Sequence, residues 1–146
     1  MTKKRPTMTS TNAEPVSVHT VGDAGADAVL DIERAALDRW GHGDPSGFLE
    51  ICAPDVTYFD PFLDRRLDGL DALTRYYESL RGKVRVDRYE LLNPRVVALG
   101  DAAVLSFNYE SRIDGEALRW NCTEAYRRTP AGWRIVHTHW SMTKPR

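Results

Sequence analysis

The stretch LRWNCTEAYRRTPAGWRIVHTHWS, residues 118–141, decides the fold that we predict. Its two halves, about residues 118–128 and 133–142, are rich in aromatic and β-branched residues, which is typical of strands. Between them, Thr129-Pro-Ala-Gly132 supplies turn chemistry, because Pro presets φ and Gly accepts positive φ. The stretch is therefore predicted to form a long antiparallel hairpin.

Alternation along the second half of this hairpin predicts which side chains share a face. His137 and His139 are two residues apart, so they are expected on one face, together with Trp133 and Ile135. Trp140 is expected on the other face. Both faces mix apolar and polar residues, which indicates a sheet with a core on one side and a pocket or a partner on the other.

Helical signals are confined to the first half of the chain. Apolar residues recur every three or four positions in residues 23–41, which predicts an amphipathic helix. Asp44-Pro45 is a capped start for a short second helix. A third helix is predicted from Asp68 or Gly69 to about Arg81. Residues 53–55 are interpreted as a turn before a short strand at 56–59.

Strand patterns dominate from residue 84 onwards. Strands are predicted at 84–92, 95–99 and 102–112, with Asn93-Pro94 as a break, and with Gly100-Asp101 and Asp114-Gly115 as hairpin turns. Helices gathered before strands predict an α+β fold in which three N-terminal helices pack on a strongly curved antiparallel sheet.

Composition bounds the organisation and the class of protein. The 146 residues are 42% hydrophobic with a formal net charge of −1, so we predict one domain at 23–146 after a flexible tail at 1–22. We expect no nucleic-acid partner, because no basic patch is evident. We expect no membrane partner, because no apolar run approaches the ~20 residues that span a bilayer. Two cysteines without a signal peptide predict free thiols and a cytoplasmic location.

Several motifs, in this order and spacing, resemble the nuclear-transport-factor-2-like superfamily, which includes ketosteroid isomerase and the SnoaL-like polyketide cyclases. Within it, the chain is most similar to the association (hub) domain of calcium/calmodulin-dependent protein kinase II. The matching pieces span about residues 32–141 and comprise Gly43-Asp44, Val56-Thr-Tyr-Phe-Asp-Pro61, Gly69-Leu-Asp71 followed by Tyr76, Glu78 and Leu80, Leu92-Asn-Pro94, Gly100-Asp101, and Trp133-x-Ile-Val-His-x-His-x-Ser141.

This resemblance implies a cone-shaped fold, a small-molecule ligand and a homodimer formed through the outer face of the sheet. The hub domain has a cavity arginine directly after the second His of His-x-His, where this chain has Trp140. Arg119 is a candidate counterpart of another cavity arginine. Two functions stay open: a cofactor-independent isomerase, cyclase or hydrolase acting on an apolar substrate, and a non-catalytic ligand-binding or self-association module.

Asp60, His137 and His139 are the candidate catalytic residues. An Asp among apolar neighbours can act as a general acid or base, and a neutral His titrates near working pH. Asp60 can equally cap the turn before Pro61, and a His can be a hydrogen-bonded member of the sheet. The three side chains could also form a two-His-one-carboxylate metal site, but no further ligand is evident, and we predict neither metal nor cofactor.

Aromatic and polar residues near Asp60 and on the penultimate strand are the candidate ligand-binding residues. A mostly apolar cavity with a few polar groups is the usual make-up of a ligand site, although aromatic residues are also enriched in cores and interfaces. Tyr58 or Asn121 is a candidate for holding a developing oxyanion. The predicted lining residues are Trp40, Tyr58, Phe59, Phe62, Arg119, Trp120 and Asn121.

Overall fold

The computed structural model describes residues 17–18 and 24–143 of the chain. Three helices come early: α1 (Ala24–Gly41), α2 (Ser46–Leu49) and α3 (Leu70–Glu78). The strands are β1 (Ser17–Val18), β2 (Cys52–Phe59), β3 (Leu67–Asp68), β4 (Arg88–Leu99), β5 (Ala102–Ile113), β6 (Glu116–Thr129) and β7 (Gly132–Met142).

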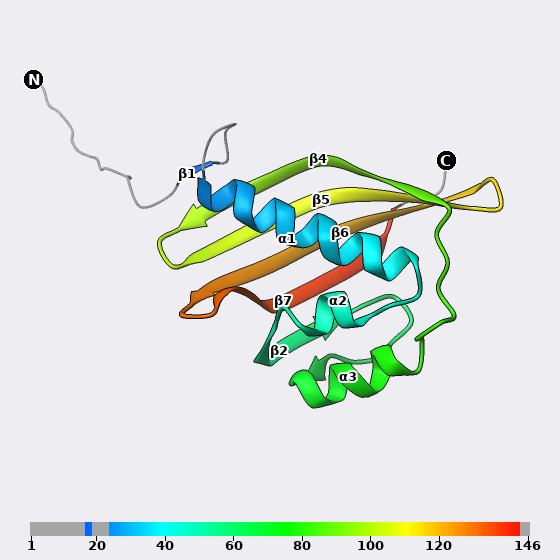
Figure 1. Cartoon of the computed structure of the whole chain (residues 1–146), viewed down its shortest axis with the longest axis horizontal. Helices are drawn as coiled ribbons and strands as arrows, with labels where there is room; N and C mark the ends of the chain where they lie inside the picture. The colour runs from blue at the N-terminus through cyan, green and yellow to red at the C-terminus, as the bar shows by residue number, and fades with distance from the viewer. Residues whose placement is uncertain (1–16, 19–23, 144–146) are drawn as a thin grey trace, which may run out of the picture.

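The described strands form one sheet in the order β1-β4-β5-β6-β7-β2-β3. Neighbouring strands are antiparallel except β2 and β7, which run parallel. The sheet is long and curved, and the helices lie on one of its faces, with α1 crossing the sheet and α3 beside β2 (Figure 1). The predicted α+β fold of helices on a curved, mostly antiparallel sheet is confirmed.

The core lies between α1 and the inner face of the sheet. The apolar stripe predicted for residues 23–41 places Val29 and Leu37 against the sheet, where they are 0% and 1% exposed. Removing this apolar surface from water is the main favourable contribution to folding. The strands supply the opposite wall, and its fully buried members include Val56, Val96, Leu105, Tyr126 and Ile135.

Two predicted breaks are wrong, because each proline is absorbed inside a strand. β2 begins at Cys52, so residues 53–55 belong to a strand instead of a turn, and its register against β7 shifts between Cys52 and Thr57. β4 continues through Asn93-Pro94 with a register shift between Leu92 and Arg95. Residues within such irregularities lack a regular ladder partner, and a proline, which lacks the N–H, is tolerated there.

A third irregularity, in β7, changes which side chains face inward. Ala125 pairs with His137 and Tyr126 with Ile135, so Val136 is an extra residue opposite the β6 ladder. The bulge reverses the alternation, and Trp133 and Ile135 therefore share the inner face with Thr138 and Trp140. We predicted that Trp140 lies on the other face of the sheet from Trp133 and Ile135, and this prediction is wrong.

The hairpin turn predicted at Asp114-Gly115 connects β5 to β6, and both residues have positive φ, 53° and 82°, as a type I′ turn requires. Within the predicted tail, Ser17–Val18 pairs with Ala98 and Val97 of β4; the other residues of that stretch lie outside the described part. None of the described helices is both long and apolar enough to cross a bilayer.

Candidate functional site

A cavity of about 450 Å³ opens between the inner face of the sheet and the helices. Its walls are mainly aromatic, and Phe62, which is 71% exposed, lies at its mouth. The volume falls in the range of small-molecule sites. The helices and their connections contribute Leu37, Trp40, Phe48, Tyr76, Tyr77, Leu80, Val84 and Val86, and β2, β5, β6, β7 and the loop after β2 contribute Tyr58, Asp60, Phe62, Tyr109, Ser111, Ile113, Leu118, Trp120 and Trp140.

Asp60 is the charged residue among those that line this cavity. It follows the last residue of β2, and its Oδ2 accepts hydrogen bonds from the hydroxyls of Tyr58, at 3.0 Å, and Tyr76, at 2.7 Å. Its Oδ1 accepts the backbone N–H of Phe62 at 2.8 Å. The turn-capping role considered for Asp60 is therefore confirmed, and it coexists with a place in the cavity wall.

The two tyrosines that hold Asp60 remain protonated. Burial raises the pKa of Tyr58 well above its usual value, and the neighbouring Tyr77 and Asp60 raise it further. Burial and the hydrogen bond to Asp60 likewise raise the pKa of Tyr76. Both phenols are thus hydrogen-bond donors across the working pH range. Because the Tyr58 proton is directed at Asp60, it is not free for the oxyanion role that we considered for this residue.

Five of the predicted site residues line the cavity, and five do not. The five that line it are Trp40, Tyr58, Asp60, Phe62 and Trp120. The five on the opposite, outer face of the sheet are Phe59, Arg119, Asn121, His137 and His139.

His137 and His139 face away from Asp60, on the other face of the sheet from Trp133 and Ile135, so the structure does not bring the three candidate catalytic residues together. Their rings pack against Phe59, with centroids 5.7 and 5.0 Å away, and the Thr57 hydroxyl lies 2.7 Å from Nδ1 of His137. Partial burial lowers the pKa of His137 below 6.5, and nearby His139 lowers it further. The described residues contain no cluster of three or more His, Cys, Asp or Glu side chains that could hold a metal ion.

Arg119 and Asn121 are also outside the cavity, because they alternate with Trp120 along β6. Arg119 forms an ion pair with Glu110 across the strands, with Nε 2.7 Å from Oε2. Asn121 exchanges hydrogen bonds with Asn108 and Ser141 on the same outer face. Neither side chain can reach a ligand in the cavity, and no arginine lines it among the described residues.

Sequence reasoning missed Tyr76, Tyr109 and Trp140 as cavity residues. Tyr76 was evident as a helical residue, but its pairing with Asp60 depends on how α3 packs against β2. Trp140 was expected on the opposite face from Trp133 and Ile135, because the bulge at Val136 has no clear sequence signal. The Trp140 ring contacts Tyr109 and Trp120, with centroids 5.6 and 6.1 Å away.

A second polar cluster lies deeper in the core, apart from the cavity. Glu33 of α1 and Glu124 of β6 are both 0% exposed. The Tyr126 hydroxyl donates to Oε1 of Glu33 at 2.7 Å, and the Thr138 hydroxyl donates to Oε2 of Glu124 at 3.0 Å. Burial, followed by the charge of Glu33, raises the pKa of Glu124 well above its usual value. Burial and mutual repulsion therefore favour a neutral, protonated Glu124 over two adjacent charges.

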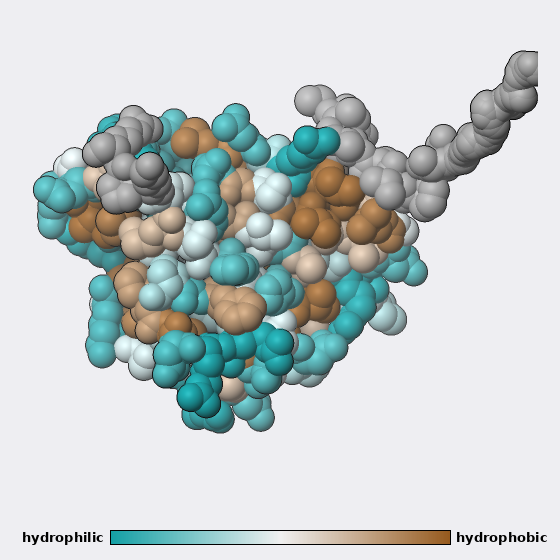
Figure 2. All heavy atoms as spheres, turned by 180° about the vertical axis from the view of Figure 1, so that it is seen from behind, coloured by the Kyte–Doolittle hydropathy of each residue, from teal (hydrophilic) through white to brown (hydrophobic). Residues whose placement is uncertain are grey.

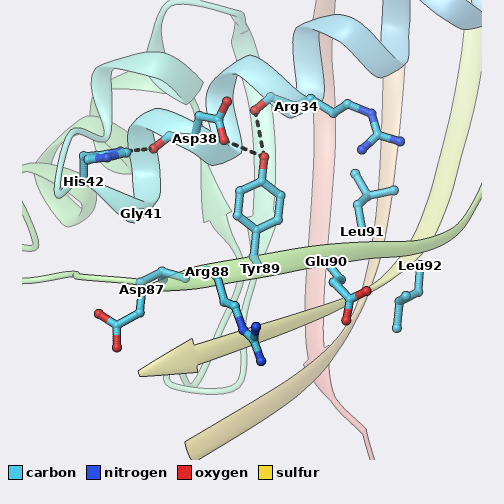
Figure 3. A pocket seen from close by; sticks show the side chains of 11 residues that line it. Arg34, Asp38, Gly41, His42, Asp87, Arg88, Tyr89, Glu90, Leu91 and Leu92 are labelled. Carbon is cyan, nitrogen blue, oxygen red and sulfur yellow. Dashed lines mark hydrogen bonds between the residues drawn. The ribbon is translucent and has the colours of Figure 1, made fainter. Parts of the chain in front are cut away.

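A groove of about 570 Å³ lies between α1 and β4 (Figure 3). Tyr89 points toward α1 and donates hydrogen bonds to the Asp38 carboxylate, at 2.8 Å, and to the Arg34 carbonyl, at 3.3 Å. Arg88 and Glu90, which alternate with it, point away from the helix (Figure 3). The polar groups of this groove therefore do not converge on one point, and we assign it a structural role in tying β4 to α1.

The chain belongs to the SnoaL-like domain family, whose profile matches residues 29–145. A candidate ketosteroid isomerase from Parabacteroides distasonis has a similar structure, with a TM-score of 0.77 and 36% identity over 86% of this chain and 93% of that chain. The S. rosetta CaMKII hub is similar with a TM-score of 0.70 and 24% identity, covering 84% of this chain and 100% of that chain.

A sequence relative is the calcium/calmodulin-dependent protein kinase type II alpha chain of Drosophila melanogaster. It is 26% identical over 123 residues, which is 79% of this chain and 23% of the kinase. The chain thus spans about a quarter of the length of that relative. A candidate dehydratase of the NTF2-like family from Streptomyces avermitilis shares the fold, with a TM-score of 0.69 and 20% identity over 84% of this chain and 99% of that chain.

Proposed function

We propose that the cavity binds an apolar small molecule and that Asp60 accepts a proton from it. The observation that carries this proposal is that Asp60 is the single carboxylate among the described residues of a wall made mainly of aromatic and aliphatic side chains. The Tyr58 and Tyr76 hydroxyls both donate to Oδ2, whereas among the described residues Oδ1 accepts only the backbone N–H of Phe62. A carboxylate oxygen has two acceptor positions, so Oδ1 keeps one for a ligand.

The reaction class that this arrangement supports is removal of a proton by a general base, as in a cofactor-independent isomerase or cyclase. Tyr58 and Tyr76 are positioning residues, because they fix the Asp60 carboxylate without facing the proton that it receives. The histidines take no part in this proposal, since they lie on the other face of the sheet. The likeness to a candidate ketosteroid isomerase and a candidate dehydratase supports the same class.

Blocking the cavity tests the proposal. Ser111 is 3% exposed and lines the cavity on β5, whereas Ser106, on the same strand, points outward and is exposed. Ser111→Leu should fill part of the cavity and weaken binding of the neutral fluorophore N-phenyl-1-naphthylamine by about tenfold or more. Ser106→Leu is the matched control and should bind as the wild type does. Equal binding by both variants would show that the fluorophore, and with it the proposed ligand, does not use this cavity.

Proton transfer has a separate test. Native mass spectrometry of protein purified from the expression host should recover a bound small molecule, which then serves as the substrate. Asp60→Asn keeps the shape and removes the base, so turnover should fall by about 10² or more while ligand binding persists. Turnover that survives in Asp60→Asn would remove Asp60 from the mechanism and leave only binding.

Self-association is the second function that we propose, as a homodimer formed through the outer face of the sheet. No described helix covers this face, and hydrophobic side chains lie there among hydrophilic ones (Figure 2). The hub likeness supports this proposal. Sedimentation at micromolar concentration should show a dimer, and Phe59→Lys, which places a charge beside His137 and His139, should dissociate it. A monomeric wild type would overturn it.

We also propose that the protein is located in the cytoplasm. Cys52 and Cys122 are free thiols, as a reducing compartment favours. Both are buried, and burial raises the pKa of each thiol, so neither is poised for nucleophilic attack.

A further inference from the structure

Charge is distributed unevenly in the cavity. Of the described residues that line it, Asp60 alone carries a formal charge. The three hydrogen bonds that it accepts all come from neutral donors. The arginines of the following loop have other partners, since Arg65 lies beside Asp64 and Arg66 pairs with Asp68. The protein thus leaves a half-buried carboxylate without a counter-charge from the described residues.

The walls around this carboxylate are π systems. Tyr76 and Tyr58 lie beside it, with ring centroids 6.0 Å apart. Farther round the wall, Trp120 contacts Phe62 at 6.0 Å and Trp140 at 6.1 Å. The face of an aromatic ring carries a partial negative charge, strongest for Trp, and attracts cations. Carboxylate and rings therefore favour the same sign of charge in the ligand.

We infer that the ligand of this cavity is an organic cation, an apolar molecule bearing an ammonium or a similar positive nitrogen. The inference rests on the proposed function and narrows its ligand class. An anionic ligand would meet the charge of Asp60 with no basic side chain on the wall to offset it. A neutral apolar ligand would displace water from the carboxylate and return nothing for the lost hydration. A cation replaces that water with an ion pair at low local dielectric and adds cation–π contacts.

The hydrogen bonds of Asp60 fix where the positive nitrogen lies. Oδ2 is occupied by the Tyr58 and Tyr76 hydroxyls, so the open acceptor position is on Oδ1. A quaternary nitrogen makes the ion pair without a hydrogen bond and leaves that position open for the proton that Asp60 receives, whereas the N–H of a protonated amine would occupy it. The rest of the ligand then extends along the wall toward Trp120, near the mouth at Phe62.

Two probes of the same shape separate charge from burial. Phenyltrimethylammonium and tert-butylbenzene differ only in whether the quaternary centre is N⁺ or C. We expect quenching of tryptophan fluorescence to give at least about tenfold tighter binding of the cation to the wild type, as an ion pair plus cation–π contact implies. Asp60→Asn should reduce this preference to less than about threefold. Asp64→Asn, which neutralises an exposed carboxylate four residues away, should leave it unchanged.

Three other results of this experiment would each contradict a different part of the reasoning. If tert-butylbenzene binds as tightly as the cation, and Ser111→Leu blocks it, the cavity binds apolar ligands and the inference of a cation is wrong. If the cation preference survives Asp60→Asn, the carboxylate is not its source, and the inference is wrong for that reason. If neither probe binds the wild type, the proposed function fails together with the inference.

Discussion

Replacing Glu124 with Gln should stabilise the protein at neutral pH, even though it alters a fully buried residue. Glu124 shares the core with Glu33, and burial together with the charge of Glu33 raises the pKa of Glu124 well above 4.5. In the unfolded chain the same carboxyl ionises near its ordinary value. Between the unfolded and folded pKa values, folding must therefore take up a proton.

The sign of the pH dependence follows from this uptake. The folded state binds more protons than the unfolded state above pH 4.5, so the free energy of unfolding falls as pH rises. The loss is about 1.4 kcal/mol for each pH unit between the unfolded and the folded pKa. The stabilising contribution is fully present only below the unfolded pKa.

A glutamine at position 124 removes this cost and keeps the contacts. Its carbonyl can accept the Thr138 hydroxyl, and its N–H can donate to Glu33 in place of the carboxylic acid proton. One amide hydrogen without a partner costs about 1 kcal/mol. Relative to the wild type, Glu124→Gln should therefore gain up to about 1.4 kcal/mol for each pH unit above 4.5, and it should be the more stable protein at pH 7. At pH 4.5 the ionisation cost is absent, so the variant should be about 1 kcal/mol less stable than the wild type because of the unpartnered amide hydrogen.

Urea unfolding followed by tryptophan fluorescence at pH 5, 6 and 7 measures the effect. Glu116→Gln, an exposed change on the same strand, is the control and should follow the pH dependence of the wild type. Parallel pH profiles for Glu124→Gln and the wild type would refute the reasoning about Glu124. If Glu33→Gln instead gave the flatter profile and the gain, the shared proton would belong to Glu33.

Three further perturbations test other parts of the structure. The Tyr109 hydroxyl is buried and has no hydrogen-bond partner among the described residues. Tyr109→Phe should therefore raise the free energy of unfolding, measured in urea, by about 1 kcal/mol. A decrease of that size would show that the hydroxyl has a hydrogen-bond partner in solution. A Cβ on Gly47 would lie 3.1 Å from Cβ of Arg39. Gly47→Ala should therefore lower the free energy of unfolding by about 1–3 kcal/mol, because it overpacks α2 against α1. An unchanged midpoint of thermal unfolding would contradict that packing. The His137 imidazole should titrate below pH 6.5 by NMR, since burial disfavours its charged form; a pKa above 6.5 would contradict its environment beside Thr57 and Phe59.

Local signals in the sequence determined the order and type of most elements. The apolar stripe of residues 23–41 gave α1, because a helix repeats every 3.6 residues whatever it packs against. Asp114-Gly115 gave the β5–β6 turn, because few residues accept positive φ at both positions of a two-residue turn. Asp60, Tyr58 and Trp120 could be named as cavity residues from their chemistry and from the family resemblance.

The tertiary structure alone decided which of the candidate residues meet. The unpaired Val136 reverses the alternation of β7, sending the histidines outward and Trp140 into the cavity, and no local preference marks a bulge at that residue. Asp60 acquires Tyr76 across 16 positions of sequence and Glu33 acquires Tyr126 across 93. Such contacts depend on the packing of whole elements, which a pattern read along the chain does not encode. The sequence by itself therefore determined the elements and the kind of chemistry, while packing decided the face, the partners and the charge of the cavity.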